Sequence, residues 1–250
     1  MSGFYRKLAV GVVAALAIAV AFLLDPIPQD PAYHDFADKR EFFGVTNFWN
    51  VMSNLPFLFV GAIGFGRLRS LVSPALRTHY LVLCAAVALV AFGSAWYHHA
   101  PSIPTLVWDR LPMTVAFMVL FSAIIADRVS WLAGRALLWP LVTAGIASIA
   151  WWVRTEAAGQ GDLRPYAIVQ FLPMLLMPMI LLLWRENSLS TKPLWLAFGA
   201  YAAAKLAEHF DELILAATGP FSGHSLKHLL AALAAWWIVR SFQGSPASAL

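Results

Sequence analysis

The sequence predicts an all-α protein that crosses a membrane several times. Hydrophobic residues make up 60% of the chain and charged residues only 12%, whereas soluble domains contain roughly 45–50% apolar and about 25% charged residues. The mean hydropathy is +0.70, and several apolar segments reach the length of about 20 residues that a helix needs to span a bilayer. The 11 tryptophans fit this class, because indole rings prefer the two membrane interfaces.

Eight segments have this length and composition, and the short breaks between them carry the charged residues. The segments lie near residues 8–24, 47–66, 77–98, 109–127, 136–153, 166–184, 193–217 and 223–240. The fold expected from them is a multi-pass transmembrane bundle with a seven-helix core and one extra N-terminal helix. The breaks are too short to hold a soluble domain.

The first segment has two interpretations. Arg6 and Lys7 precede its apolar core, as in a signal peptide, but the core is longer than usual and runs into Asp25-Pro26 without a small-residue cleavage site. We therefore expect a retained helix. The chain then divides into an N-terminal helix with its linker, a seven-helix domain and a flexible tail, at residues 1–30, 31–242 and 243–250.

Basic residues in the short loops predict the orientation in the cell membrane. On the side of the chain's first residues, the loops carry Arg6, Lys7, Arg67, Arg69, Arg77, Arg128, Arg135, Arg185, Lys192 and Arg240. By the positive-inside rule this side is cytoplasmic. The alternation of helices then places His98 and Asp109 near the non-cytoplasmic face. The segment that begins with His224 and His228 starts at the same face.

Three histidines in apolar segments are the main candidates for function. His224 and His228 are four residues apart, so a helix presents them on one face, while His98 must come from a different helix. Such a three-nitrogen site suits zinc and leaves a fourth position for water. The alternative is a set of packing histidines that hydrogen-bond to their neighbours, although ionisable groups within a membrane are functional by default.

Ser94 and Asp109 accompany this predicted zinc site. Ser94 lies one turn before His98 on the same helical face, and Asp109 begins the next apolar segment. The carboxylate can take a proton from a metal-activated water, and the hydroxyl can donate to a carbonyl oxygen that gains negative charge. The structural alternatives are a serine bonded to its own helix backbone and an aspartate that caps the next helix.

The ordered set of polar residues resembles that of the CREST superfamily of membrane hydrolases, which includes alkaline ceramidases and adiponectin-receptor-like proteins. The residues that carry the resemblance are Ser94, His98, Asp109, His224 and His228. The segment Asn47-Phe-Trp-Asn-Val-Met-Ser-Asn54 is most similar to the alkaline ceramidases, and the resemblance covers about residues 33–240. It implies that the histidines bind zinc, the aspartate holds a water and the serine assists. The implied reaction is hydrolysis of a ceramide amide to a sphingoid base and a fatty acid.

The same resemblance implies a calcium site just before residue 48. Asp35, Asp38 and Asn47 offer the oxygen ligands that calcium prefers. However, Lys39 and Arg40 add positive charge, and an asparagine stands at position 47 where the family has an acid. For both aspartates a solvated loop is the favoured alternative.

A second polar cluster lies on the segment before His224. Its charged or titratable members are Lys205, Glu208, His209, Asp211 and Glu212, and Lys227 lies beside His228. Glu208 or Asp211 can pair with Lys227, or can accept the second ring N–H of a zinc-bound histidine and thereby select its tautomer. The structural ion pair is the favoured interpretation.

The residues predict a zinc-dependent hydrolase in the membrane with no nucleic-acid partner. The resemblance implies that it cleaves the amide of a ceramide-like membrane lipid, acts in sphingolipid metabolism and also binds Ca²⁺. A receptor-like seven-helix protein with structural zinc and no turnover is the rival, because adiponectin-receptor relatives keep the same ligands. A metal or proton transporter would need ionisable residues through the whole membrane depth. Here such residues cluster near one face.

Overall fold

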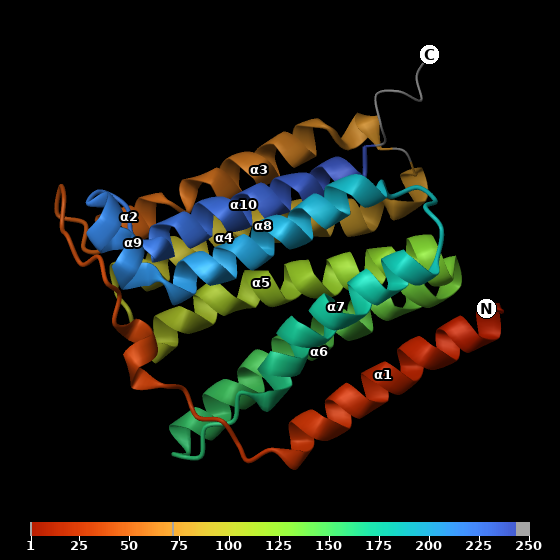
Figure 1. Ribbon diagram of the computed structural model, residues 1–250, viewed down its shortest axis with the longest axis horizontal. Helices are drawn as coiled ribbons and strands as arrows, with labels where there is room; N and C mark the ends of the chain where they lie inside the picture. Colours follow the sequence, from red (N-terminus) through yellow and green to blue (C-terminus); the bar gives the residue numbers. More distant parts are fainter. Residues whose placement is uncertain (1, 72, 244–250) are drawn as a thin grey trace. The chain divides into compact units, whose positions relative to one another are not determined.

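The computed structural model describes residues 2–71 and 73–243, and the regular secondary structure within these ranges is helical. The described residues contain no β-strand, only an isolated bridge between Phe42 and Val45. The all-α prediction is thereby confirmed, and Figure 1 shows the helices with the labels used below. The predicted tail, residues 243–250, lies outside the described residues except for Gln243.

The helices and short helical turns follow one another along the chain with few long connections. In order they are α1 (Gly3–Leu23), η1 (Pro31–His34), α2 (Phe48–Met52), α3 (Leu55–Gly66), η2 (Leu68–Ser70), η3 (Pro74–Leu76), α4 (Arg77–His99), α5 (Ile103–Ile124), η4 (Ile125–Val129), α6 (Trp131–Ala157), α7 (Arg164–Leu183), α8 (Thr191–His209), α9 (Asp211–Thr218) and α10 (Gly223–Ser241).

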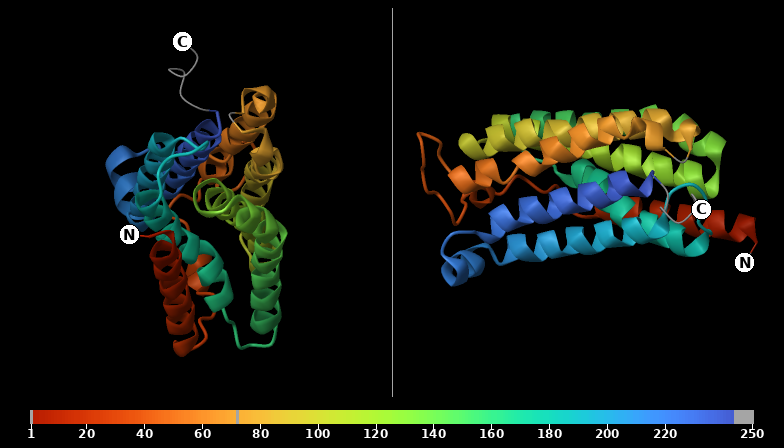
Figure 2. Two further views of the ribbon diagram at one scale, coloured as in Figure 1. Left: turned by 90° about the vertical axis from the view of Figure 1, so that its right-hand side faces the viewer. Right: turned by 90° about the horizontal axis from the view of Figure 1, so that it is seen from above.

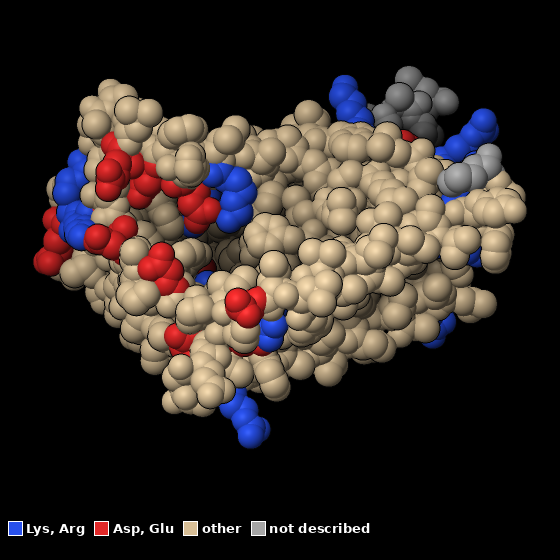
Figure 3. Space-filling view, turned by 60° about the horizontal axis from the view of Figure 1, so that its bottom comes forward, with Lys and Arg blue, Asp and Glu red and all other residues tan. Residues whose placement is uncertain are grey.

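Six helical segments of the described chain are long and apolar enough to cross a membrane. They are Gly3–Leu23, Phe48–Gly66, Pro74–His99, Ile103–Val129, Trp131–Ala157 and Arg164–Leu183. The face drawn in Figure 3 consists mostly of uncharged side chains. The chain is thus an integral membrane protein, as the composition predicts, and the division into seven core helices plus one stays a prediction.

The predicted span 193–217 is wrong as a single helix. The chain forms α8 and α9 instead, with a break at Phe210, whose backbone leaves the helical region. The Asp211 carboxylate accepts hydrogen bonds from the backbone N–H groups of Ala37 and His224. These long-range bonds fix the turn after α8, and local apolar periodicity does not reveal them.

The helix that carries Asp109 begins earlier than predicted. It was expected to start near residue 109, but α5 starts at Ile103, so Asp109 lies in its second turn. Pro104 is the second residue of α5, and proline is well tolerated in the first helical turn, where its missing N–H would have no partner in the helix. Asp109 is therefore not a helix cap, and that alternative is excluded.

The chain forms two compact units. One comprises residues 1–30 and 114–189, in which α7 packs against both α1 and α6. The other comprises residues 31–113 and 190–250, and in it α3 packs against α4 and α8 against α10. In Figures 1 and 2 α8 and α10 lie side by side along their length. The division predicted at residues 30 and 242 stays a prediction.

Two glycines permit close helix contacts in the second unit. A Cβ atom on Gly93 would lie 2.0 Å from the Trp108 carbonyl oxygen, so only glycine allows α4 and α5 to approach this closely here. A Cβ atom on Gly223 would lie 2.1 Å from the Ala207 carbonyl oxygen, where α10 begins against the end of α8. These contacts bring together the ends of the helices that carry the polar residues.

Candidate metal centre

Three histidines converge in the second unit. His98 lies in the last turn of α4, and His224 and His228 lie in the first two turns of α10. All three are buried, and each offers a ring nitrogen within 4.8 Å of the others. The Nε2 atoms of His98 and His224 are 3.4 Å apart. Two nitrogens at about 2.0–2.1 Å from a tetrahedral zinc lie about 3.3–3.4 Å apart, so this spacing fits a shared ion.

The surroundings of the triad also fit a metal ion. The Phe36 ring covers one side, with centroid distances of 4.7 Å to His98 and 4.6 Å to His224. The Nε2 atoms of His98 and His224 face each other, and two neutral imidazole lone pairs this close repel each other unless a proton or a cation lies between them. A zinc ion satisfies such a set, and the three-nitrogen donor set is one that zinc uses.

Ser53, at the end of α2, orients one of the three rings. Its hydroxyl donates to the Asn50 carbonyl oxygen at 3.1 Å and lies 2.7 Å from His228 Nδ1. Because the hydroxyl has one proton, it accepts from Nδ1–H, which leaves the Nε2 lone pair of His228 for a metal. The sequence analysis missed this residue, since no spacing rule connects position 53 with position 228.

Replacing Ser53 with alanine is expected to lower zinc affinity about 10–100-fold, the usual effect of removing a hydrogen-bond partner from a metal-ligating histidine. The matched control is Ser148→Ala, because Ser148 is also buried and donates to the carbonyl three residues before it but contacts no predicted ligand. Chelator competition on the purified variants measures the two zinc dissociation constants. Equal constants for the two variants would contradict the assigned role of Ser53.

Ser94 and Asp109 form a hydrogen-bonded pair. The Ser94 hydroxyl bonds to the Asp109 carboxylate, and both residues are buried. Gly93 allows this contact, because it lets the α5 backbone come close to α4 next to Ser94. The role expected for Ser94 toward a substrate carbonyl stays a prediction.

Glu208 forms ion pairs with two lysines, one on α8 and one on α10. Its two carboxylate oxygens bind Lys205 and Lys227, each at 2.8 Å. The predicted ion pair between Glu208 and Lys227 is therefore present. Lys227 Nζ also lies 3.0 Å from His224 Nε2, so a metal at that nitrogen would replace the lysine contact, while the bond to Glu208 remains available.

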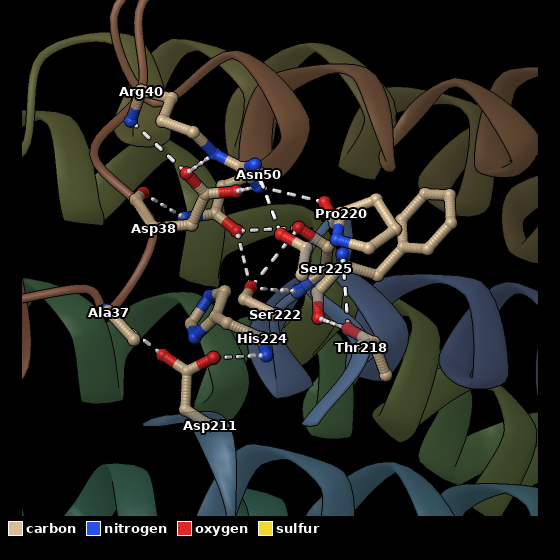
Figure 4. Close-up of polar contacts among 12 residues, drawn as sticks. Ala37, Asp38, Arg40, Asn50, Asp211, Thr218, Pro220, Ser222, His224 and Ser225 are labelled. Atoms are coloured by element: carbon tan, nitrogen blue, oxygen red, sulfur yellow. Dashed lines mark hydrogen bonds and ion pairs between the residues drawn. The ribbon is translucent and has the colours of Figure 1, made fainter. Parts of the chain in front are cut away.

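Asp211 supports the backbone and not an imidazole ring. Its oxygens accept from the backbone N–H of His224 at 2.7 Å and of Ala37 at 3.1 Å, and Figure 4 shows the carboxylate between these two residues. The two alternatives suggested for Asp211, pairing with Lys227 or accepting from a histidine ring, do not occur in the structure.

The predicted calcium ligands do not form a common site. Both Asp38 oxygens bind the Arg40 side chain, at 2.8 and 2.6 Å, and Asp35 is exposed and pairs with Lys39. The Asn47 amide donates to the His98 carbonyl oxygen at 2.8 Å. The basic residues that the sequence places beside the aspartates already provide their counter-charge. The residues of this stretch therefore do not fit a calcium ion.

A pocket of about 490 Å³ reaches His224 from the surface of the second unit. Tyr33 and Phe36 line it together with several charged or titratable residues. These are Asp35, Glu208, His209, Asp211 and Glu212. The pocket gives water and small polar groups access to His224, one of the three histidines.

Comparison with protein families supports an assignment. The family model described as Ceramidase matches residues 43–205, more than half of the chain. The matched range includes His98 and Asp109 and ends before α10. No curated protein matches the chain.

Proposed function

The chain belongs to the ceramidase family, and from this premise we propose that it is a zinc-dependent hydrolase of the N-acyl amide bond in a ceramide-like lipid. The observation that carries the proposal is the convergence of three buried imidazoles from α4 and α10. His98, His224 and His228 would hold the ion. A zinc ion held there would act as a Lewis acid and would make a water molecule more acidic.

Asp109 is the proposed proton carrier. The water oxygen adds to the amide carbonyl carbon, and the Asp109 carboxylate accepts the proton that the water loses. Asp109 then delivers this proton to the amide nitrogen as the C–N bond breaks. The products are a free amine and a carboxylic acid, so one water is consumed for each bond. Ser94 is the proposed positioning residue, because its hydroxyl bonds to the Asp109 carboxylate and fixes its direction.

The proposed substrate is a lipid that reaches the triad within the membrane. The six apolar segments embed the chain in a bilayer, and the resemblance to alkaline ceramidases favours an N-acyl sphingoid lipid. We place the catalytic residues toward the non-cytoplasmic face, because the loops at the other ends of these helices carry more Lys and Arg.

The proposal is tested by incubating the purified protein with a panel of N-acyl lipids and measuring release of fatty acid. We expect release from a ceramide or a close analogue, loss of release after chelation, and recovery on adding zinc. A protein that retains zinc but releases no fatty acid from any member of the panel would instead match the receptor-like alternative.

A further inference from the structure

The Arg40 guanidinium joins two distant parts of the second unit. Its Nε and Nη2 atoms donate to the two Asp38 oxygens at 2.8 and 2.6 Å. Its Nη1 and Nη2 atoms donate to the carbonyl oxygens of Gly219 at 3.1 Å and Pro220 at 2.8 Å. Arg40 precedes α2, whereas Gly219 and Pro220 precede α10, so one cation binds four oxygens from both segments (Figure 4).

The Asp38 carboxylate depends on this cation. Its side chain is 1% exposed, whereas that of Arg40 is 40% exposed. Burial alone would raise the pKa of the Asp38 carboxyl, but the hydrogen bonds from Arg40 outweigh burial and hold that pKa below its ordinary value. A buried carboxylate of this kind needs a charged partner, and Arg40 is the ion-pair partner that the structure provides.

The same segment is connected to the start of α10. The Asn50 amide donates to the Asp38 carbonyl oxygen at 3.2 Å, and its own oxygen accepts from Ser225 Oγ at 2.8 Å and Ser222 Oγ at 3.3 Å. Ser222 in turn caps α10, since its hydroxyl oxygen accepts from the Ser225 N–H. Figure 4 shows these contacts in one cluster next to His224.

We propose that Arg40 is a built-in cation that sets the position of His224 and His228 and makes the metal centre independent of calcium. Two carboxylate and two carbonyl oxygens are ligands that calcium also uses. Here the planar guanidinium, with five donors in a fixed fork, takes them instead. Arg40 is a positioning residue in this account, and the inference rests on the proposed function only in that zinc is the ion held by the triad.

The test compares Arg40→Ala with its neighbour Lys39→Ala. Lys39 is exposed and pairs with the exposed Asp35, so its replacement is expected to leave zinc affinity unchanged. Arg40→Ala is expected to lower zinc affinity about 10–100-fold, as for other groups that orient metal ligands. Added guanidinium ion, far below denaturing concentrations, is expected to restore the affinity of Arg40→Ala, and sodium at equal ionic strength is not.

Two further measurements do not depend on zinc in the variant. Hydrogen exchange of the metal-free proteins is expected to be faster at residues 219–228 in Arg40→Ala than in Lys39→Ala. In the unmodified protein, Ca²⁺ at about 1 mM, a concentration that weak calcium sites bind, is expected to leave zinc affinity unchanged. This second arm applies even if Arg40→Ala fails to fold.

Three results would overturn the inference. These are unchanged zinc affinity and exchange in Arg40→Ala, a loss of affinity that guanidinium does not restore, and a zinc affinity of the unmodified protein that rises with Ca²⁺. Failure of the proposed function has a different signature, namely an unmodified protein that binds no zinc or hydrolyses no N-acyl lipid. In that case the hydrogen exchange comparison still decides the role of Arg40.

Discussion

Replacing His228 with alanine is expected to remove the bound zinc and to reduce lipid hydrolysis to the background rate. Structural zinc sites with four ligands bind with about 10–16 kcal/mol, which is about 3 kcal/mol for each ligand. Loss of one imidazole therefore corresponds to a drop in affinity of roughly a hundredfold or more. His228 also makes the hydrogen bond to Ser53 at 2.7 Å that orients its ring, so the variant loses an oriented ligand.

Metal analysis of the purified variant measures this effect directly. The matched control is His99→Ala, because His99 follows His98 in the chain but is exposed and contacts Thr46 and Trp96. We expect about one zinc per chain in the control, bound by the three histidines, and almost none in His228→Ala. Zinc retained at the control level in His228→Ala would show that this imidazole is not a ligand.

Replacing Asp109 with asparagine is expected to leave zinc in place and to lower the rate of hydrolysis by about 10²–10⁴-fold, the usual contribution of a general acid–base group. Asparagine has nearly the same shape, and its carbonyl oxygen can still accept the hydrogen bond that Ser94 donates to Asp109. It cannot, however, take up and return a proton. Zinc content and the hydrolysis rate are measured on the same purified sample.

Asp162→Asn provides the control for this experiment. Asp162 is also a buried carboxylate, but it belongs to the first unit and binds Arg164 and Trp151. We expect this variant to keep both zinc and turnover. If Asp109→Asn lost zinc together with activity, Asp109 would be a support for the metal and not a proton carrier. Full activity in Asp109→Asn would remove it from the reaction.

The parts of the site that the sequence predicts are those set by spacing along one helix. The histidines of α10 are four residues apart, and this alone places them on one face. His98 lies in the last turn of α4 and His224 in the first turn of α10, and the lengths of the apolar segments predict that these helix ends lie at a similar membrane depth. Local periodicity and bilayer thickness together therefore identify the triad.

The remaining features depend on hydrogen bonds between residues far apart in the chain. Ser53 and Asn50 contact α10 only because the helices pack, and no pattern in the sequence connects them with it. The break before α9 depends on the bond from Ala37 to Asp211. The sequence shows the residues on which the calcium prediction depends. It does not show that the Arg40 side chain turns back and binds both Asp38 oxygens, so that Asp38 pairs with a guanidinium.

X-ray absorption at the zinc edge of the purified protein tests the central claim most directly. The account predicts about one zinc per chain, surrounded by three imidazole nitrogens at about 2.0–2.1 Å and one further light atom that is not part of the protein. Absence of zinc, or a fourth ligand from a protein side chain, would contradict it, because a closed site has no position at which water can be activated.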